Sequence, residues 1–462
     1  MTSLLQLSLR QIGALYAQKK LSPVEVTQAC LKQALKYNPA FNAFALLDEH
    51  QALRAAKASE KRWMKGAARG SLDGIPVTVK DWLHVKGWPT RYGSSVSSSL
   101  KQPEDSPAVA RLREAGTIFL GKTTLPEYGH KGVTDNALTG VTRNPWNMNK
   151  TSGGSSGGAG VAAACGMGLL HLGSDAGGSI RIPASFCGVF GFKPSPRLVP
   201  SWPAGLFSEL SSIGVLTRAA DDAALAMDMI TRPDARDWHA LPLPPTDFAS
   251  VMNNAIPKLR IAYAGSINGI TATPAVAQIL QTAIKALKKL GTVDEIDLQA
   301  PHLVSTFNRH WAAAASYMVA SFSAKDRKKL DPRLLYWAEA GDGMNLHDYL
   351  QARLQRETIG AYFKSLLDTY DLIITPTTAM SAFDVGQNMP MDAKGKTWDD
   401  WTPFTYPANI AGLPAASIPA GITKEGLPAG LQIIAGFLKD ALVLQVAKQL
   451  ESEIVFKPWL ES

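Results

Sequence analysis

The feature that most constrains the fold is a stretch rich in glycine and serine, residues 152–193, that is also apolar. Flexible glycine–serine linkers are polar throughout. Here the glycines are interleaved with the apolar run from Val161 to Ala164 and with Leu169 and Leu170. The segment is therefore predicted to pack inside the protein and not to connect two domains.

Short β-branched runs alternate with helical periodicity along the chain. Ser8 and Ser22 each precede apolar residues at helical spacing, and Glu25 follows Ser22 at the position that completes a capping box. The run 75–80 predicts a strand that ends on Lys80. Further helices are predicted at about 49–65 and 109–115, and further strands at 117–120, 372–375, 415–419 and 431–434. Strands alternating with helices indicate an α/β sheet.

Composition excludes several classes of protein. Apolar residues make up 46% of the 462 residues and charged residues 19%, which is a globular composition. The net charge of +8 is spread out, so a nucleic-acid surface is not indicated. Three cysteines at wide spacing, Cys30, Cys165 and Cys187, predict neither a disulfide framework nor a zinc site and suit a reducing cytoplasm. Without a visible signal peptide or apolar span, a cytoplasmic protein is expected.

Two short motifs suggest other chemistry. Residues 116–123 satisfy the P-loop pattern Gly-x-x-x-x-Gly-Lys-Thr, but the interior Thr-Ile-Phe-Leu predicts a strand where an open loop must surround phosphates. Residues 153–157 satisfy Gly-x-Ser-x-Gly, but a loop precedes them where a nucleophile elbow needs a strand. A nucleotide-binding P-loop protein is kept only as a distant alternative.

A longer set of motifs runs through most of the chain. The central pattern begins with residues 153–159, continues with 173–184 and ends with 187–194. Further motifs, in order along the chain, stand at 74–81, 119–127, 142–146, 376–378 and 407–414. Over about residues 5–455 the chain resembles the amidase signature family of serine hydrolases. The resemblance implies one compact α/β/α domain over 1–462 with a mixed central sheet, a signature core at about 72–200 and a variable insert at about 232–350.

The resemblance also implies the catalytic residues. Ser179 is expected to be the nucleophile, Ser155 a bridging serine and Lys80 the base, with no metal or cofactor. A serine hydroxyl needs a base to take its proton, and a lysine can do so only when burial lowers its pKa. A second hydroxyl can relay protons because it both donates and accepts. The predicted reaction is hydrolysis of a linear amide through an acyl-enzyme, which releases ammonia or an amine.

The glycine-rich turn before the nucleophile is predicted to form the oxyanion hole. Backbone N–H groups that converge there stabilise a developing oxyanion. The donors expected are those of Ala176, Gly177, Gly178 and Ser179. The family usually has threonine where this chain has Ala176, and the bond between Gly154 and Ser155 is expected to be cis. Arg181 is expected to pair an acid such as Asp175, and Ser174 to hydrogen-bond within the site.

The sequence constrains the identity of the substrate less than it constrains the catalytic residues. The family includes amidases and the A subunit of the glutamyl-tRNA amidotransferase, in which an arginine and an aspartate hold glutamine. Arg356 stands at the arginine position and Thr402 at the aspartate position, so glutamine would lack a partner for its ammonium. Arg356 predicts a substrate with a carboxylate, unless it is an ordinary helix-surface arginine. The amidotransferase subunit remains the alternative function.

Other substrate contacts are predicted from position in the sequence. Trp398 and Trp401 are expected to line the pocket or to pack the domain. Tyr128 and His130 follow the motif at 119–127. His130 stands where the family commonly has an apolar residue, and it either reaches the substrate or lies in an exposed loop. The expected partner is a small-molecule amide, with no nucleic acid or membrane. A homodimer and a small partner subunit both stay open.

Overall fold

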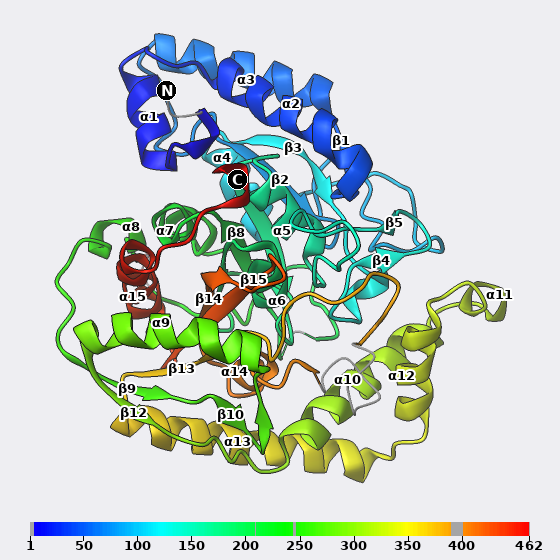
Figure 1. Ribbon diagram of the computed structural model, residues 1–462. Coiled ribbons are helices and arrows are strands. Elements are labelled where there is room, and N and C mark those ends of the chain that lie inside the picture. Colours follow the sequence, from blue (N-terminus) through cyan, green and yellow to red (C-terminus); the bar gives the residue numbers. More distant parts are fainter. Residues whose placement is uncertain (1–3, 208, 244–245, 390–400, 462) are drawn as a thin grey trace.

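One large sheet organises the chain, with helices on both of its faces (Figure 1). The computed structural model describes residues 4–207, 209–243, 246–389 and 401–461. Within these described ranges, eleven strands join in the order β1-β3-β2-β6-β8-β7-β14-β15-β13-β9-β12. They are β1 (Phe44–Leu47), β2 (Pro76–Lys80), β3 (Ile118–Thr123), β6 (Leu170–Asp175), β7 (Phe190–Lys193), β8 (Ser212–Thr217), β9 (Leu259–Tyr263), β12 (Gly291–Glu295), β13 (Leu372–Pro376), β14 (Ala415–Ile422) and β15 (Pro428–Ala435).

The sheet is mixed. Strand β2 runs parallel to β3 and β6, and β9 runs parallel to β12 and β13, while the remaining pairs are antiparallel. Two small hairpins lie outside it: β4 (Asp135–Asn136) with β5 (Gly140–Val141), and β10 (Ser266–Ile267) with β11 (Ile270–Thr271). The α/β architecture expected from the sequence is confirmed, and it is a single domain built on one mixed sheet.

Helices cover both faces of the sheet. Helices α5 and α6 pack on one face, while α7, α9 and α15 pack on the other. The helices are α1 (Leu9–Ala17), α2 (Pro23–Phe41), α3 (Glu49–Met64), α4 (Pro107–Glu114), α5 (Gly157–Ala164), α6 (Arg181–Cys187), α7 (Ala220–Ile230), α8 (Phe248–Val251), α9 (Pro274–Leu290), α10 (Leu303–Ala320), α11 (Ala324–Arg327), α12 (Pro332–Asp342), α13 (Leu346–Thr369), α14 (Tyr406–Ile410) and α15 (Asp440–Glu453). Within the described part of the chain, none of these helices is long and apolar enough to span a bilayer.

The predicted helix starts at Ser8 and Ser22 are confirmed. Both serines cap their helices, and each capping box is complete, with the Glu25 carboxylate accepting a hydrogen bond from the backbone N–H of Ser22. Such boxes satisfy N–H groups that the helix itself leaves without partners. The predicted strands also form, and β2 ends on Lys80 as expected.

The glycine-rich segment packs as its composition predicts. Helix α5 is built of glycine, alanine and one valine, and all of its residues are buried. A methyl group on Gly158 would lie 2.4 Å from the carbonyl oxygen of Ala43. Only glycine allows so close an approach between this helix and the chain that leads into β1. The segment therefore brings the backbone before α5 deep into the protein.

The insert expected at about 232–350 contributes to the core sheet as well as to the surface. It contains β9 and β12, the two strands at one edge. Its later part forms α10 and α12, which pack on each other, and α10 also packs on α13 (Figure 1). The boundaries of this insert stay a prediction.

Candidate active site

The three predicted catalytic residues all line one pocket. Lys80 is the last residue of β2, and Ser174 lies near the end of the neighbouring strand β6. Ser155 precedes α5, and Ser179 precedes α6. The ends of two parallel strands and the starts of two short helices thus converge on one point.

Lys80 is completely buried and has hydroxyl groups as its closest partners. Its Nζ lies 2.7 Å from Ser155 Oγ, 3.0 Å from Ser174 Oγ and 3.4 Å from the Ser174 carbonyl oxygen. Burial lowers the pKa of Lys80 to about 7, although the negative charge of Asp175 opposes that shift. The amine therefore loses its proton far more easily than an exposed lysine does. The predicted hydrogen bonding of Ser174 within the site is confirmed.

The two candidate serines are held by the backbone around them. The peptide bond between Gly154 and Ser155 is cis, as expected. Ser156 N–H donates to the Ser179 carbonyl oxygen at 3.0 Å, which ties the two loops together. Both Ser155 and Ser179 face the pocket, and only 3% and 6% of their surfaces are exposed. Their hydroxyls are thus presented to the pocket and are largely shielded from bulk water.

The oxyanion-hole prediction needs a correction at Gly178. The N–H of Gly178 donates to Asp175 Oδ1 at 2.7 Å, so it is already used to fix the turn. Within the described residues, the N–H groups of Ala176, Gly177 and Ser179 have no such acceptor. These three groups remain the candidate donors to an oxyanion.

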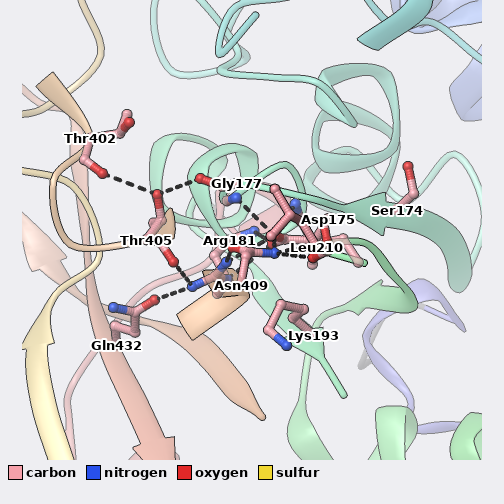
Figure 2. Close-up of polar contacts among 12 residues, drawn as sticks. Ser174, Asp175, Gly177, Arg181, Lys193, Leu210, Thr402, Thr405, Asn409 and Gln432 are labelled. Carbon is pink, nitrogen blue, oxygen red and sulfur yellow. Dashed lines mark hydrogen bonds and ion pairs between the residues drawn. The ribbon is translucent and has the colours of Figure 1, made fainter. Parts of the chain in front are cut away.

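A buried ion pair anchors the turn that precedes Ser179 (Figure 2). Arg181 donates to both carboxylate oxygens of Asp175, at 2.8 and 3.0 Å. Burial raises the pKa of Asp175, but the charge and hydrogen bonds of Arg181 outweigh it and hold that pKa well below its usual range. The predicted pairing of Arg181 with Asp175 is confirmed.

The same ion pair is tied to the C-terminal third of the chain. Arg181 also donates to Gln432 Oε1 and Asn409 Oδ1, both at 2.6 Å. Thr405 Oγ1 donates to the Gly177 carbonyl oxygen at 2.8 Å, and Figure 2 shows this contact beside the arginine. Every donor and acceptor in such a buried network needs a partner, so the network fixes the turn that carries Gly177 and Ser179.

The predicted substrate contacts separate into one that reaches the pocket and several that do not. Tyr128 lines the pocket. His130 is fully buried, with Nδ1 2.7 Å from the Glu127 carbonyl oxygen, and is placed outside the lining. Trp401 stacks on Phe186 at 5.8 Å and packs the core. Thr402 is buried outside the lining as well, and Trp398 lies outside the described residues.

Arg356 is also placed away from the pocket of Ser179. Its guanidinium donates to the Ile410 carbonyl oxygen at 2.9 Å and to the Glu209 carbonyl oxygen at 2.7 Å, and it pairs with the Glu209 carboxylate at 3.3 Å. It borders a separate cavity formed partly by α13. The carboxylate that Arg356 contacts is therefore that of Glu209, within the protein. The position of Arg356 gives no support to a substrate that carries a carboxylate.

The P-loop alternative is wrong. The residues between Gly116 and Lys122 belong largely to strand β3, which is buried along its whole length. Lys122 Nζ lies 2.7 Å from Asp81 Oδ1, so its charge is compensated inside the protein. No open loop remains in this segment to surround a phosphate.

Most of the aromatic lining of the pocket was not predicted from the sequence. Trp82, Trp202, Phe207 and Trp311 border the pocket together with Tyr128. They come from distant segments, so no spacing in the sequence links them. Trp82 alone carried a signal, because it follows Lys80 by two residues.

Comparisons with known proteins agree with the geometry. Residues 25–444 match the family model described as Amidase. An acylamidase of Rhodococcus erythropolis is 33% identical over 98% of this chain and 96% of its own length. The A subunit of a glutamyl-tRNA(Gln) amidotransferase from Cyanothece sp. is 32% identical over 98% of each chain.

Solved structures extend the likeness to three dimensions. The structure of a bacterial aryl acylamidase of the amidase signature family matches with a TM-score of 0.89 at 28% identity, and covers 98% of this chain and 97% of the other. A substrate complex of 6-aminohexanoate cyclic dimer hydrolase matches with a TM-score of 0.89 at 25% identity, over the whole of both chains at 100%. The chain belongs to the amidase signature family and is an enzyme that hydrolyses carbon–nitrogen amide bonds.

Proposed function

We propose that the enzyme hydrolyses a linear amide through an ester formed on Ser179, with Ser155 and Lys80 moving the protons. Ser179 Oγ attacks the amide carbonyl carbon. The hydroxyl proton passes to Ser155 Oγ, whose own proton passes to the neutral amine of Lys80. A C–O bond forms, and the carbonyl electron pair moves onto the oxygen, which becomes an oxyanion.

The oxyanion then collapses and the C–N bond breaks. Ser155 donates its proton to the departing nitrogen and is reprotonated by Lys80, so ammonia or an amine leaves and Lys80 is neutral again. Water repeats the sequence on the ester and releases the carboxylic acid. Backbone donors at Ala176, Gly177 and Ser179 suit the oxyanion, and each such donor is typically worth about 3–4 kcal/mol.

One observation carries this proposal: the 2.7 Å contact between Lys80 Nζ and Ser155 Oγ in a buried site. The closest partners of the amine are hydroxyls, and its pKa is lowered to about 7. A general base works best when its pKa is close to the operating pH. A lysine held by a hydroxyl at the floor of a pocket therefore fits proton transfer better than structural support.

The test is release of ammonia or amine from a panel of amides. The panel contains aliphatic, aryl, peptide C-terminal and carboxylated amides, ureas and glutamine. Activity on at least one of them, lost in Ser179→Ala, is expected. Ser365→Ala is the matched control, because this exposed serine lies on α13 and its hydroxyl donates to the Tyr362 carbonyl oxygen on the same helix. Equal activity in wild type and Ser179→Ala would contradict the proposal.

The amidotransferase A subunit is the alternative, and the 32% identical relative from Cyanothece sp. is the observation that favours it. Thr402 stands where that subunit is expected to carry an aspartate for the glutamine ammonium. We therefore expect glutamine to be a poor substrate for the isolated chain. Glutamine turnover that exceeds the turnover of every other amide would favour the alternative.

A further inference from the structure

Four of the aromatic rings that line the pocket of Ser179 lie in two groups, each packed against a further ring, and Trp202 and Trp238 line the pocket as well. In the first group, the ring of Trp82 meets Tyr92 edge-on at 5.4 Å, and Tyr92 stacks on Tyr128 at 5.7 Å. Tyr128 has a φ of 48°, which a residue with a side chain rarely adopts, so the surrounding structure fixes the backbone from which this ring extends. Trp82 and Tyr128 both face the pocket.

The second group begins with Phe207. Its ring stacks on Trp311 at a centroid distance of 4.3 Å, and Phe307 stacks on Trp311 at 5.2 Å. Phe207 and Trp311 line the pocket, while Phe307 is fully buried behind them. Rings that are already packed lose little conformational freedom when a ligand binds, so this surface is preorganised for a flat apolar group.

Gly129 joins the first aromatic group to the catalytic hydroxyl. A methyl group at Gly129 would lie 3.3 Å from Ser155 Oγ and 3.9 Å from the six-membered ring of Trp82. Because glycine lacks this methyl group, the Ser155 hydroxyl and the indole can both lie close to the backbone at residue 129. In the proposed reaction, Ser155 protonates the departing nitrogen. A nitrogen that takes its proton from Ser155 therefore lies on the side of the pocket that carries Trp82.

We propose that this enzyme acts on N-aryl amides, and that Trp82, Tyr128 and Phe207 select the aromatic ring of the departing amine. Aromatic pairs in stacked or edge-to-face arrangements are favourable beyond the area that they bury. The inference rests on the proposed function, because it places the nitrogen by the role given to Ser155. It also specifies that the aromatic ring lies on the amine side of the amide bond.

Two of the charged side chains that line the pocket, Arg236 and Asp237, already have partners, so they favour an uncharged ring. Arg236 is paired with Asp234 at 2.8 Å and with Glu104 at 2.7 Å. The Asp237 carboxylate accepts hydrogen bonds from the N–H groups of Ser201 and His239, at 2.8 and 3.0 Å. Arg197 borders this pocket and also the separate cavity beside Glu209. It is the residue to test for any preference for an anionic ring.

The experiment compares pairs of substrates in which a planar aromatic ring is replaced by a saturated cyclohexyl ring. Acetanilide is paired with N-cyclohexylacetamide, which varies the departing amine, and benzamide with cyclohexanecarboxamide, which varies the acyl group. The aryl-to-cyclohexyl ratio of kcat/KM is measured in wild type and in Trp82→Leu. The intrinsic reactivity of each compound is the same for both enzymes, so a change in the ratio reports the aromatic contact.

The ratio for the acetanilide pair is expected to fall about fivefold to tenfold in Trp82→Leu, with little change in the benzamide pair. Phe207→Leu is a second variant in case Trp82→Leu does not fold, and a smaller fall in the same pair is expected there. Phe437→Leu, an exposed aromatic residue outside the pocket, is the control. An unchanged acetanilide ratio in both pocket variants, or a fall confined to the benzamide pair, would overturn the inference.

A carboxylated substrate tests the charge argument. The values of kcat/KM for 4-acetamidobenzoate and acetanilide are expected to agree within about threefold, as for a contact without a buried ion pair. A preference of about tenfold or more for the carboxylated compound, lost in Arg197→Gln, would overturn the claim of an uncharged ring. If neither pair is hydrolysed but Ser179-dependent activity on another amide is found, the proposed function stands and this inference fails.

Discussion

Lys80 and Lys122 lie on adjacent parallel strands, and both are almost completely buried, at 0% and 1% exposure. Their surroundings differ. Lys122 pairs with Asp81 at 2.7 Å and also donates to Thr90 Oγ1 and the Pro89 carbonyl oxygen. Lys80 contacts two serine hydroxyls and a carbonyl oxygen. Burial lowers the pKa of both amines, but in Lys122 the carboxylate of Asp81 directly opposes the shift.

This difference supports the proposal that the two lysines have different roles. An amine next to a carboxylate has a partner of opposite charge, and removing either partner leaves the other charge buried and uncompensated. An amine among hydroxyls can give its proton up and take one back. Lys193 shows that a low pKa alone is not enough. Its pKa is also lowered to about 7, by burial and by the charge of Arg181, but its Nζ donates to the Pro194 carbonyl oxygen and it lies outside the pocket lining.

The largest effect is expected at Lys80. Lys80→Met removes the proposed base, and kcat is expected to fall by roughly 10³-fold or more. The melting temperature at pH 7 is expected to stay the same or to rise, because a buried amine that is protonated in the unfolded chain no longer has to be desolvated. Steady-state kinetics and calorimetry measure the two quantities. A variant that keeps more than a tenth of the activity would contradict the role of Lys80.

The matched change at Lys122 should act on stability. Lys122→Met leaves the Asp81 carboxylate buried without its partner, and a loss of about 3–5 kcal/mol in the free energy of unfolding is expected. Adding Asp81→Asn should restore much of it. Urea unfolding gives the free energies, and kcat per folded molecule should stay near that of wild type. If Lys122→Met retained its stability but lost catalysis, the comparison of the two lysines would be reversed.

The smallest effect is expected at Ser174. Ser174→Ala removes one of the two hydroxyls near Lys80 Nζ but leaves the 2.7 Å contact with Ser155. We expect kcat to fall by about tenfold or less, since one hydrogen bond that positions the base is lost. Ser365→Ala serves again as the control. A loss as large as in Lys80→Met would mean that Ser174 and not Ser155 carries the proton.

Local patterns explain the part of the fold that the sequence predicts. The capping boxes at Ser8 and Ser22 and the strand that ends on Lys80 depend on neighbouring residues only. The motifs also identified the three residues that meet in the pocket, as well as the pairing of Arg181 with Asp175, six residues away. Each of these features depends on residues within a short segment, or on motifs whose order along the chain can be recognised in the sequence.

The substrate contacts were less predictable because their direction depends on distant partners. Arg356 is held by Glu209, 147 positions earlier in the chain, and no spacing reveals that pair. His130 turns inward toward the Glu127 carbonyl oxygen, and Trp401 packs on Phe186. Gly178 is a donor as expected, but Asp175 accepts its hydrogen bond. The aromatic lining is assembled from segments that only the folded sheet brings together.

The most direct test of the central claim is the pH profile of kcat/KM. With the pKa of Lys80 lowered to about 7, the base is neutral above that pH and protonated below it, so kcat/KM should fall about tenfold per pH unit on the acid side. The same limb should persist in Lys122→Met and in Lys193→Met. A profile that is flat between about pH 5.5 and 8.5, or a limb that disappears when Lys193 is replaced, would contradict Lys80 as the base.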